Sequence, residues 1–170
     1  MKFYDREQEI RKLREIERRS HEVAQFTVVT GRRRVGKSSL ILKACESFTF
    51  AYLFVERKSE KDLCEGFAAE LESKFGMQFY GAPSRFEDLF LAILKHSVEH
   101  PITVVVDEFQ EFLKVNKSIF SVMQHHWDVY QGRAKLNLIV SGSVYTLMQK
   151  IFLSRKASLY GRATSFFKIQ

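Results

Sequence analysis

Residues 26–38 read Phe-Thr-Val-Val-Thr-Gly-Arg-Arg-Arg-Val-Gly-Lys-Ser, and this stretch decides the fold. The apolar run 26–30 predicts a strand, and residues 39–45 after the stretch predict a helix. Residues 31–38 between them match the phosphate-binding pattern G-x-x-x-x-G-K-[ST]. Because the motif needs a strand before it and a helix N-terminus facing the anion, its context here is the correct one. The sequence therefore predicts a nucleoside triphosphate site.

Each position of this loop has a physical role in replacing the water around a polyphosphate. Gly31 and Gly36 permit backbone torsions and close approach that a side chain blocks, so that successive amides can line the anion. Lys37 is expected to reach the β- and γ-phosphates, and the Ser38 hydroxyl to ligate Mg²⁺. Ser39 either contributes to the site or only extends the first helical turn. The other loop residues assigned to nucleotide binding are Arg32, Arg33, Arg34 and Val35.

A second acidic motif follows the β-branched run at residues 102–106. Such a run is typical of a strand buried on both faces of a parallel sheet. At its end, Asp107 is expected to hold Mg²⁺ through water, and Glu108 to polarise the attacking water as a general base. The alternative, a buried strand that ends in two solvated carboxylates, is disfavoured by the phosphate loop upstream. The adjacent glutamate favours hydrolysis over phosphoryl transfer to a small substrate.

Composition sets limits on the class of protein. The 170 residues indicate one domain, and 45% hydrophobic content is ample for a packed core. The net charge of +7 is compatible with a nucleic-acid partner. However, three arginines lie inside the phosphate loop, and those between Arg6 and Arg19 alternate with glutamates, which favours a solvated mixed-charge helix. Charge alone does not establish DNA binding.

Cysteines, histidines and apolar runs exclude several other classes. Cys45 and Cys64 form no C-x-x-C pair, and we expect buried, reduced thiols in the cytoplasm. No apolar run has the length of a membrane span, and the N-terminus carries no signal-peptide pattern. His125 and His126 do not predict a metal site, because neighbouring helical residues point about 100° apart.

Hydrophobic periodicity predicts alternating helices and strands in an α/β, three-layer sandwich. We expect a mostly parallel five-stranded sheet with helices on both faces. The expected strands are 26–30, 51–55, 102–107, 136–140 and 165–169. The apolar helix faces are Ile10, Leu13 and Ile16; Leu63, Phe67, Leu71 and Phe75; Phe86, Leu89, Phe90, Ile93 and Leu94; and Phe120, Met123 and Trp127. Ser84 is expected to cap the third of these helices, with Glu87 in capping-box register.

Several segments in a fixed order resemble one known family. They are residues 3–7, the loop 31–37, Asp107-Glu108-Phe109-Gln110, Ser141-Gly142-Ser143 and residues 159–162. This ordered set resembles the archaeal-type ATPases of the AAA+/STAND group of P-loop proteins over nearly the whole chain. Single elements such as the Ser-Gly-Ser turn are weak signals, whereas the ordered set, with its arginine-rich loop and Asp-Glu-Phe-Gln, is specific.

The resemblance implies that the strand ending at Ser141 lies between the phosphate-loop strand and the Asp107 strand. Ser141 then resembles the polar sensor that contacts the γ-phosphate or the attacking water, with Ser143 as the fallback. The alternative is a simple strand-ending turn. Phe3, Tyr4 and Arg6 resemble an N-terminal box that packs near the adenine, and a helix-entry staple explains them equally well.

Arg162 resembles the arginine that such ATPases place near the γ-phosphate, in cis or across a subunit contact; the alternative is a surface arginine in a turn. Action in trans implies a homo-oligomer. The chain ends at Gln170, so we expect a single nucleotide-binding domain, 1–170, without the helical lid and downstream modules of the family. A missing lid implies weak binding and slow hydrolysis.

Three functions from different classes follow. The first is an Mg²⁺-dependent ATPase that uses Lys37, Ser38, Asp107 and Glu108. The second is an ATP-gated interaction or DNA-associated switch with little turnover. The third, a P-loop kinase, ranks last because no acceptor site is evident. ATP as the nucleotide follows from the family resemblance, since no guanine-reading Asn-Lys-x-Asp sequence is present.

Overall fold

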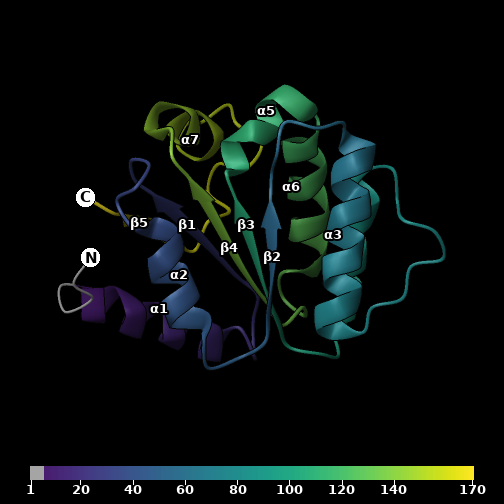
Figure 1. Cartoon of the computed structure of the whole chain (residues 1–170), viewed down its shortest axis with the longest axis horizontal. Helices are drawn as coiled ribbons and strands as arrows, with labels where there is room; N and C mark the ends of the chain where they lie inside the picture. Colours follow the sequence, from purple (N-terminus) through teal and green to yellow (C-terminus); the bar gives the residue numbers. More distant parts are fainter. Residues whose placement is uncertain (1–5) are drawn as a thin grey trace.

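A five-stranded parallel sheet forms the centre of the molecule in a computed structural model that describes residues 6–170 (Figure 1). The strands are β1 (Gln25–Thr30), β2 (Phe50–Phe54), β3 (Ile102–Asp107), β4 (Leu136–Gly142) and β5 (Ser165–Lys168). Their order is β2-β3-β4-β1-β5, and every neighbouring pair is parallel. The expected strands are confirmed within two residues at each end. The position of β4 between β1 and β3, implied by the family resemblance, is also confirmed.

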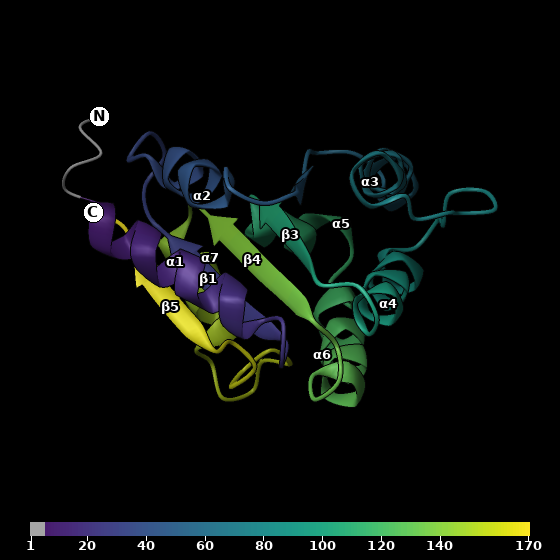
Figure 2. The same cartoon turned by 90° about the horizontal axis from the view of Figure 1, so that it is seen from below.

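Helices cover both faces of this sheet (Figures 1 and 2). They are α1 (Glu7–Arg19), α2 (Lys37–Cys45), α3 (Glu60–Phe75), α4 (Phe86–Ser97), α5 (Phe112–Val115), α6 (Ile119–Tyr130) and α7 (Tyr145–Phe152). The first two pack on one face, and α3, α4, α6 and α7 pack on the other. The short α5 lies beyond the carboxyl ends of the strands (Figure 1). Among residues 6–170, no helix is both long and apolar enough to cross a membrane.

The two faces follow from the period-2 alternation of the strands. In β1, Val28 joins the core under α3, α4, α6 and α7, whereas Val29 joins the core under α1 and α2. Both side chains are buried, as is every residue of β1, β3 and β4. These three strands therefore read as apolar runs, since a central strand of a covered parallel sheet has no solvent face.

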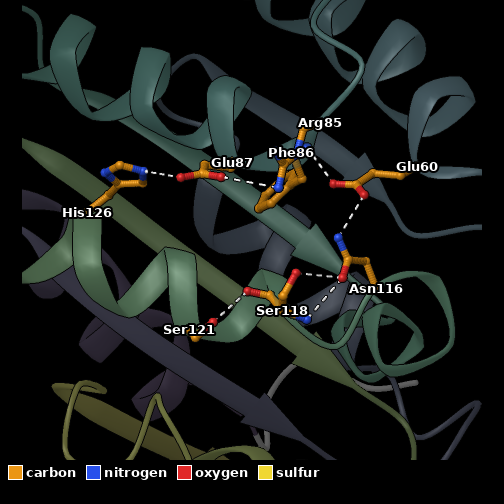
Figure 3. A network of polar contacts seen from close by, with 8 residues as sticks. All are labelled: Glu60, Arg85, Phe86, Glu87, Asn116, Ser118, Ser121 and His126. Atoms are coloured by element: carbon orange, nitrogen blue, oxygen red, sulfur yellow. Dashed lines mark hydrogen bonds and ion pairs between the residues drawn. The ribbon is translucent and has the colours of Figure 1, made fainter.

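One predicted helix start is wrong. We expected Ser84 to cap α4, but the N-cap residue is Arg85, whose backbone is extended and whose side chain makes no capping bond. Instead, the carboxylate of Glu60 at the start of α3 accepts a 2.8 Å hydrogen bond from the Phe86 amide (Figure 3). The helix begins too late for Ser84 to reach its amides, and an anionic partner from a neighbouring helix supplies a stronger bond.

Glu60 also ties this corner to the segment after β3. Its second oxygen accepts a 3.0 Å bond from the Asn116 side-chain amide, just beyond α5 (Figure 3). Glu87, expected in the capping box, faces His126 of α6 at 3.3 Å. The expected apolar face of α4 is confirmed, because all five of its residues are buried. The 3₁₀ turn Phe109–Glu111 and α5 and α7 were not expected from the sequence.

Phe26 anchors the larger core, and its truncation is the first test of the fold. Its ring makes edge contacts with Trp127 of α6 and Phe152 of α7, at centroid distances of 5.2 and 5.6 Å. Phe26→Ala should lower the free energy of unfolding by about 3–5 kcal/mol, because the cavity cannot close between two helices and a sheet. Urea denaturation measures this change. Phe166→Ala is the control, since 52% of that side chain is exposed, and an equal loss for both would contradict the assignment.

Candidate functional site at the carboxyl edge of the sheet

The phosphate-binding loop joins β1 to α2, and its backbone adopts two left-handed positions. Gly36, the N-cap of α2, has φ 96°, and Arg34 has φ 65°. Glycine adopts this region without strain, which explains the requirement at position 36. The turn aims the first amides of α2 into the loop, as an anion site requires. Lys37 and Ser38 are the first two residues of that helix.

Lys37 is buried at the floor of the loop. Its ammonium donates a 2.9 Å hydrogen bond to the main-chain oxygen of Arg32. Burial lowers the pKa of Lys37, and the nearby carboxylates of Glu108 and Asp107 oppose this shift. The ammonium is therefore poorly solvated and gains from a further anion nearby. Lys37 therefore lies within the electrostatic influence of both acidic residues that the sequence assigned to the site.

Gly31 is required for a different reason from Gly36. A Cβ at position 31 would lie 2.6 Å from the main-chain oxygen of Ile169, at the end of β5. The Ile169 amide in turn donates a 2.7 Å bond to the Thr30 oxygen. The start of the loop thus rests directly on the backbone of the neighbouring strand, and only glycine fits there.

Asp107 collects donors from four segments of the chain. Its Oδ1 accepts 2.6 Å from the Ser141 hydroxyl and 2.9 Å from the Glu108 amide. Its Oδ2 accepts 3.2 Å from the Ser38 hydroxyl and also accepts from the Tyr52 hydroxyl. The side chain is buried, and these bonds compensate for the loss of water around the charge. The structure therefore brings together Ser38, Asp107 and Ser141, as the sequence predicted.

Tyr52 is a member of the site that the sequence analysis missed. It lies on β2, opposite Val105 in the parallel register with β3, two residues before Asp107. Burial raises the pKa of Tyr52, and the bond to Asp107 raises it further, so the phenol stays a proton donor at neutral pH. The available signal was a polar-tipped aromatic in an apolar strand, but its meaning depends on β2 lying beside β3.

Glu108 follows Asp107 with a left-handed backbone, at φ 55° and ψ 43°. This conformation costs about 1–2 kcal/mol for a residue with a Cβ. Its Oε2 accepts two hydrogen bonds, 2.5 Å from the Gln110 amide and 2.9 Å from the Ser143 hydroxyl. Ser143, the expected fallback for Ser141, thus contacts the second acidic residue and not the first.

The remaining residues assigned to nucleotide binding surround this centre or lie outside the described part. Arg32, Arg33, Arg34 and Ser39 are exposed, and Val35 is partly buried. Arg6 donates 2.5 Å to the main-chain oxygen of Gln170 and pairs with Glu9 at 3.7 Å. Phe3 and Tyr4 lie outside residues 6–170, which the structure describes.

A cleft of about 630 Å³ opens beside the loop. Gly31, Arg32 and Val35 form one side, Ser143 and Tyr145 form another, and residues 168–170 close it. The Lys168 ammonium lies over the Tyr145 ring at 4.4 Å from its centroid. The volume lies in the range of small-molecule sites, and the walls offer cations, an aromatic ring and main-chain groups.

Arg162 is the one predicted catalytic residue that the structure does not bring to this centre. It precedes β5 at the amino ends of the strands, where the Thr164 amide donates to the oxygen of Phe26. Its guanidinium binds both oxygens of Asp128, at 3.1 and 2.8 Å. The loop and both acids follow the carboxyl ends of the strands, so action in cis is wrong in this structure. Action in trans stays a prediction.

The cysteines take no part in the site. Cys45 and Cys64 are free and fully buried, as expected. Burial raises the pKa of each thiol to about 12, so neither is a nucleophile at neutral pH.

Comparisons with known proteins agree with this geometry. A family model described as an ATPase domain predominantly from Archaea matches residues 3–170. An uncharacterised protein of Methanocaldococcus jannaschii is 30% identical over 168 residues, which cover 99% of this chain and 36% of that protein. The chain thus spans about a third of this relative.

Two solved structures share the fold. A Walker-type ATPase of Pyrococcus abyssi superposes with a TM-score of 0.71 at 21% identity, over 98% of this chain and 53% of its own. Cdc6p of Pyrobaculum aerophilum gives 0.66 at 14% identity, over 99% of this chain and 46% of its own. At such low identity these matches establish the architecture alone.

The contact between Gly31 and β5 gives a test of the loop. Gly31→Ala should lower the free energy of unfolding by about 1–3 kcal/mol, because its Cβ meets backbone that cannot move freely. Gly66→Ala within α3 is the matched control: a Cβ there meets nothing within 4 Å, and the change should stabilise by about 0.5–1 kcal/mol. Thermal and urea unfolding measure both. Equal stability of the two variants would contradict the close approach.

The Arg162–Asp128 pair predicts a pH-dependent stability. The hydrogen bond from Arg162 lowers the pKa of Asp128, so its contribution is present at neutral pH and is lost as the pH falls through that lowered pKa. At pH 7, Arg162→Ala should lower the Tm by about 2–4 °C, in line with an exposed pair worth about 1 kcal/mol. Calorimetry at pH 7 and below pH 3 measures the difference, with Arg155→Ala as an exposed control. A difference that persists in acid would refute the assignment.

Proposed function

The chain belongs to the family of ATPase domains found predominantly in Archaea, and we propose that it binds ATP with Mg²⁺ and hydrolyses it. The fold is that of a P-loop ATPase core. The observation that carries the proposal is the convergence of Ser38, Asp107 and Ser141 at the mouth of the loop. Ser38 is the last residue of the phosphate-loop motif, Asp107 ends β3, and Ser141 comes from β4, the strand between β1 and β3. Their side chains thus meet at one point of the sheet edge.

The donors at this point fit Mg²⁺. The Ser38 hydroxyl and Asp107 Oδ2 lie 3.2 Å apart, and both are hard oxygen ligands of the kind this ion prefers. Ser38 would bind the ion directly and Asp107 through water. When bound, Mg²⁺ neutralises charge on the β- and γ-phosphate oxygens.

The loop supplies the cationic side of the phosphate site. Lys37 would reach the β- and γ-phosphates, leaving the Arg32 oxygen that it contacts now. Among residues 6–170, no ion pair is found for Arg32, Arg33 or Arg34, so their charges are available to an anion. The loop amides between Gly31 and Ser39 would bind the phosphate oxygens.

The nucleoside is assigned to the cleft beside the loop. Arg6 contacts Gln170, which lines that cleft, and this contact supports an N-terminal box in which Tyr4 and Arg6 lie near the adenine. Adenine as the base follows from the family. Within this proposal Glu108 activates the attacking water, and Ser141 acts as the sensor of the γ-phosphate. The proposal places the domain in the cytoplasm, where ATP and Mg²⁺ are present.

An ATP-gated switch with little turnover is the second candidate, and the position of Arg162 favours it. Among residues 6–170, no arginine forms an ion pair with Asp107 or Glu108, and Arg162 binds Asp128 instead. Arg162 could therefore neutralise transition-state charge only from a second copy. Turnover would then depend on assembly. The basic net charge leaves a DNA partner open without supporting one by a specific contact.

Two substitutions separate binding from hydrolysis. Lys37→Ala should weaken Mg²⁺-ATP binding by at least tenfold, because it removes a buried cation from the phosphate site. Glu108→Gln should leave the ATP Kd within about threefold and lower kcat by at least about 100-fold, because it removes the general base. Calorimetric titration gives the Kd, and phosphate release gives kcat. EDTA should abolish release.

The controls decide between the candidates. Lys43→Ala, in the last turn of α2, removes an exposed lysine and should change neither value. Lys37-dependent binding without phosphate release at any protein concentration would favour the switch. Release that rises with protein concentration and is lost in Arg162→Ala would support action in trans. Unchanged ATP binding in Lys37→Ala would refute the proposed site.

A further inference from the structure

Glu108 is held by two side chains that no part of the proposed reaction accounts for. Gln110 lies in the 3₁₀ turn Phe109–Glu111, for which Glu108 is the N-cap residue. Ser143 is the first residue after β4, the strand beside β3. Both donate to the same oxygen, Oε2, at 2.5 and 2.9 Å. Among residues 6–170, no hydrogen bond to Oε1 is found, so one oxygen is held and the other is left for a ligand.

The orientation of the Gln110 side-chain amide leaves its oxygen without a hydrogen-bond partner. Its side chain is 1% exposed, and its Oε1 is buried without a hydrogen-bond partner. A buried carbonyl left unpaired is expensive, so an amide placed only for packing would be replaced by an apolar side chain. Turning the amide over would set its oxygen against the Glu108 carboxylate, and two acceptors would repel. The Glu108 contact is therefore what this glutamine provides.

Gly142 makes room for that amide. A Cβ at position 142 would lie 2.5 Å from Gln110 Oε1 and 2.5 Å from the sulfur of Met148 in α7. Three successive residues at the end of β4 thus shape this site: Ser141 donates to Asp107, Gly142 leaves room for Gln110, and Ser143 donates to Glu108. The 3₁₀ turn that carries Gln110 packs against α7 and β4, beyond the ends of the strands in Figure 1.

From these contacts we infer that Gln110 and Ser143 are positioning residues for Glu108. They hold one carboxylate oxygen, fix the side chain on its left-handed backbone and leave the second oxygen to take the proton of the attacking water. Ser143 also lines the cleft beside the loop, but in this scheme its hydroxyl is engaged by Glu108, and neither residue donates a hydrogen bond to ATP. The inference rests on the proposed role of Glu108 as the general base.

The test uses Gln110→Met, which keeps the shape of the side chain and removes the amide, and Ser143→Ala, which removes the hydroxyl. Each should lower kcat about 10–100-fold and leave the ATP KM and Kd within about threefold, because the base is misplaced while the phosphate site is intact. Ser143→Thr should restore kcat to within about threefold, since it keeps the hydroxyl. Gln149→Met and Ser121→Ala, at exposed positions, are the matched controls and should be unchanged.

A second arm separates positioning from a general loss of structure. In the Glu108→Gln background, Gln110→Met and Ser143→Ala should cause no further fall in kcat, because all three act through one group. A further fall of tenfold or more would overturn the inference, as would wild-type kcat in both single variants. A kcat that rises on loss of either contact would also overturn it and identify the contacts as inhibitory.

Failure of the inference and failure of the proposed function give different results. If Glu108→Gln keeps wild-type turnover, the general-base assignment fails. If Glu108→Gln is inactive while Gln110→Met and Ser143→Ala are fully active, only the inference about positioning fails, and the general-base assignment stands. Thermal unfolding of each variant checks the fold. If Gln110→Met does not fold, Ser143→Ala, at a partly buried position, and its threonine rescue decide the question.

Discussion

The carboxylate of Asp107 is the point on which the functional end of the molecule depends. Ser38 of α2, Tyr52 of β2, Ser141 of β4 and the amide of Glu108 all donate to it. A buried charge persists only when such bonds replace its water, so these donors must be in place together. The sheet order β2-β3-β4-β1 places the donor strands β2 and β4 on either side of β3, which carries Asp107. The order of the strands therefore determines which hydrogen-bond donors reach Asp107, and with them the chemistry of the site.

Local sequence patterns predicted most of the fold because the central strands have no polar face. The runs at 26–30, 102–107 and 136–140 are apolar and β-branched, and each is a fully buried strand. The phosphate loop was predictable because its role is in the backbone, through glycines at fixed spacing. The position of β4 between β1 and β3 came from family resemblance, since nothing in a strand's own sequence names its neighbour.

Most of the parts that the sequence did not predict depend on contacts between residues far apart in the chain. Tyr52 matters only because β2 lies beside β3, and Gln110 only because Glu108 turns back over its own 3₁₀ turn. Ser84 was a sound local cap, but Glu60 from another helix took that role. Arg162 fitted a family pattern, yet its turn lies at the amino ends of the strands, where Asp128 binds it. For Tyr52, Ser84 and Arg162, a partner distant in sequence decided the outcome; for Gln110 the partner is only two residues away, and the left-handed backbone of Glu108 decided it.

The strand order also has a consequence for how the chain is made. β1, which precedes the phosphate loop, is synthesised before the other four strands, but both of its neighbours, β4 and β5, begin only at Leu136 and Ser165. Until those strands are synthesised, the two edges of β1 have no partner, while β2 and β3 can already pair. An apolar strand with unpaired edges is prone to aggregate or to pair wrongly. The nascent chain is therefore most prone to aggregation at β1, the strand that leads into the nucleotide-binding loop. The helices α1 and α2 are made early and can cover one face of β1 before its partner strands appear.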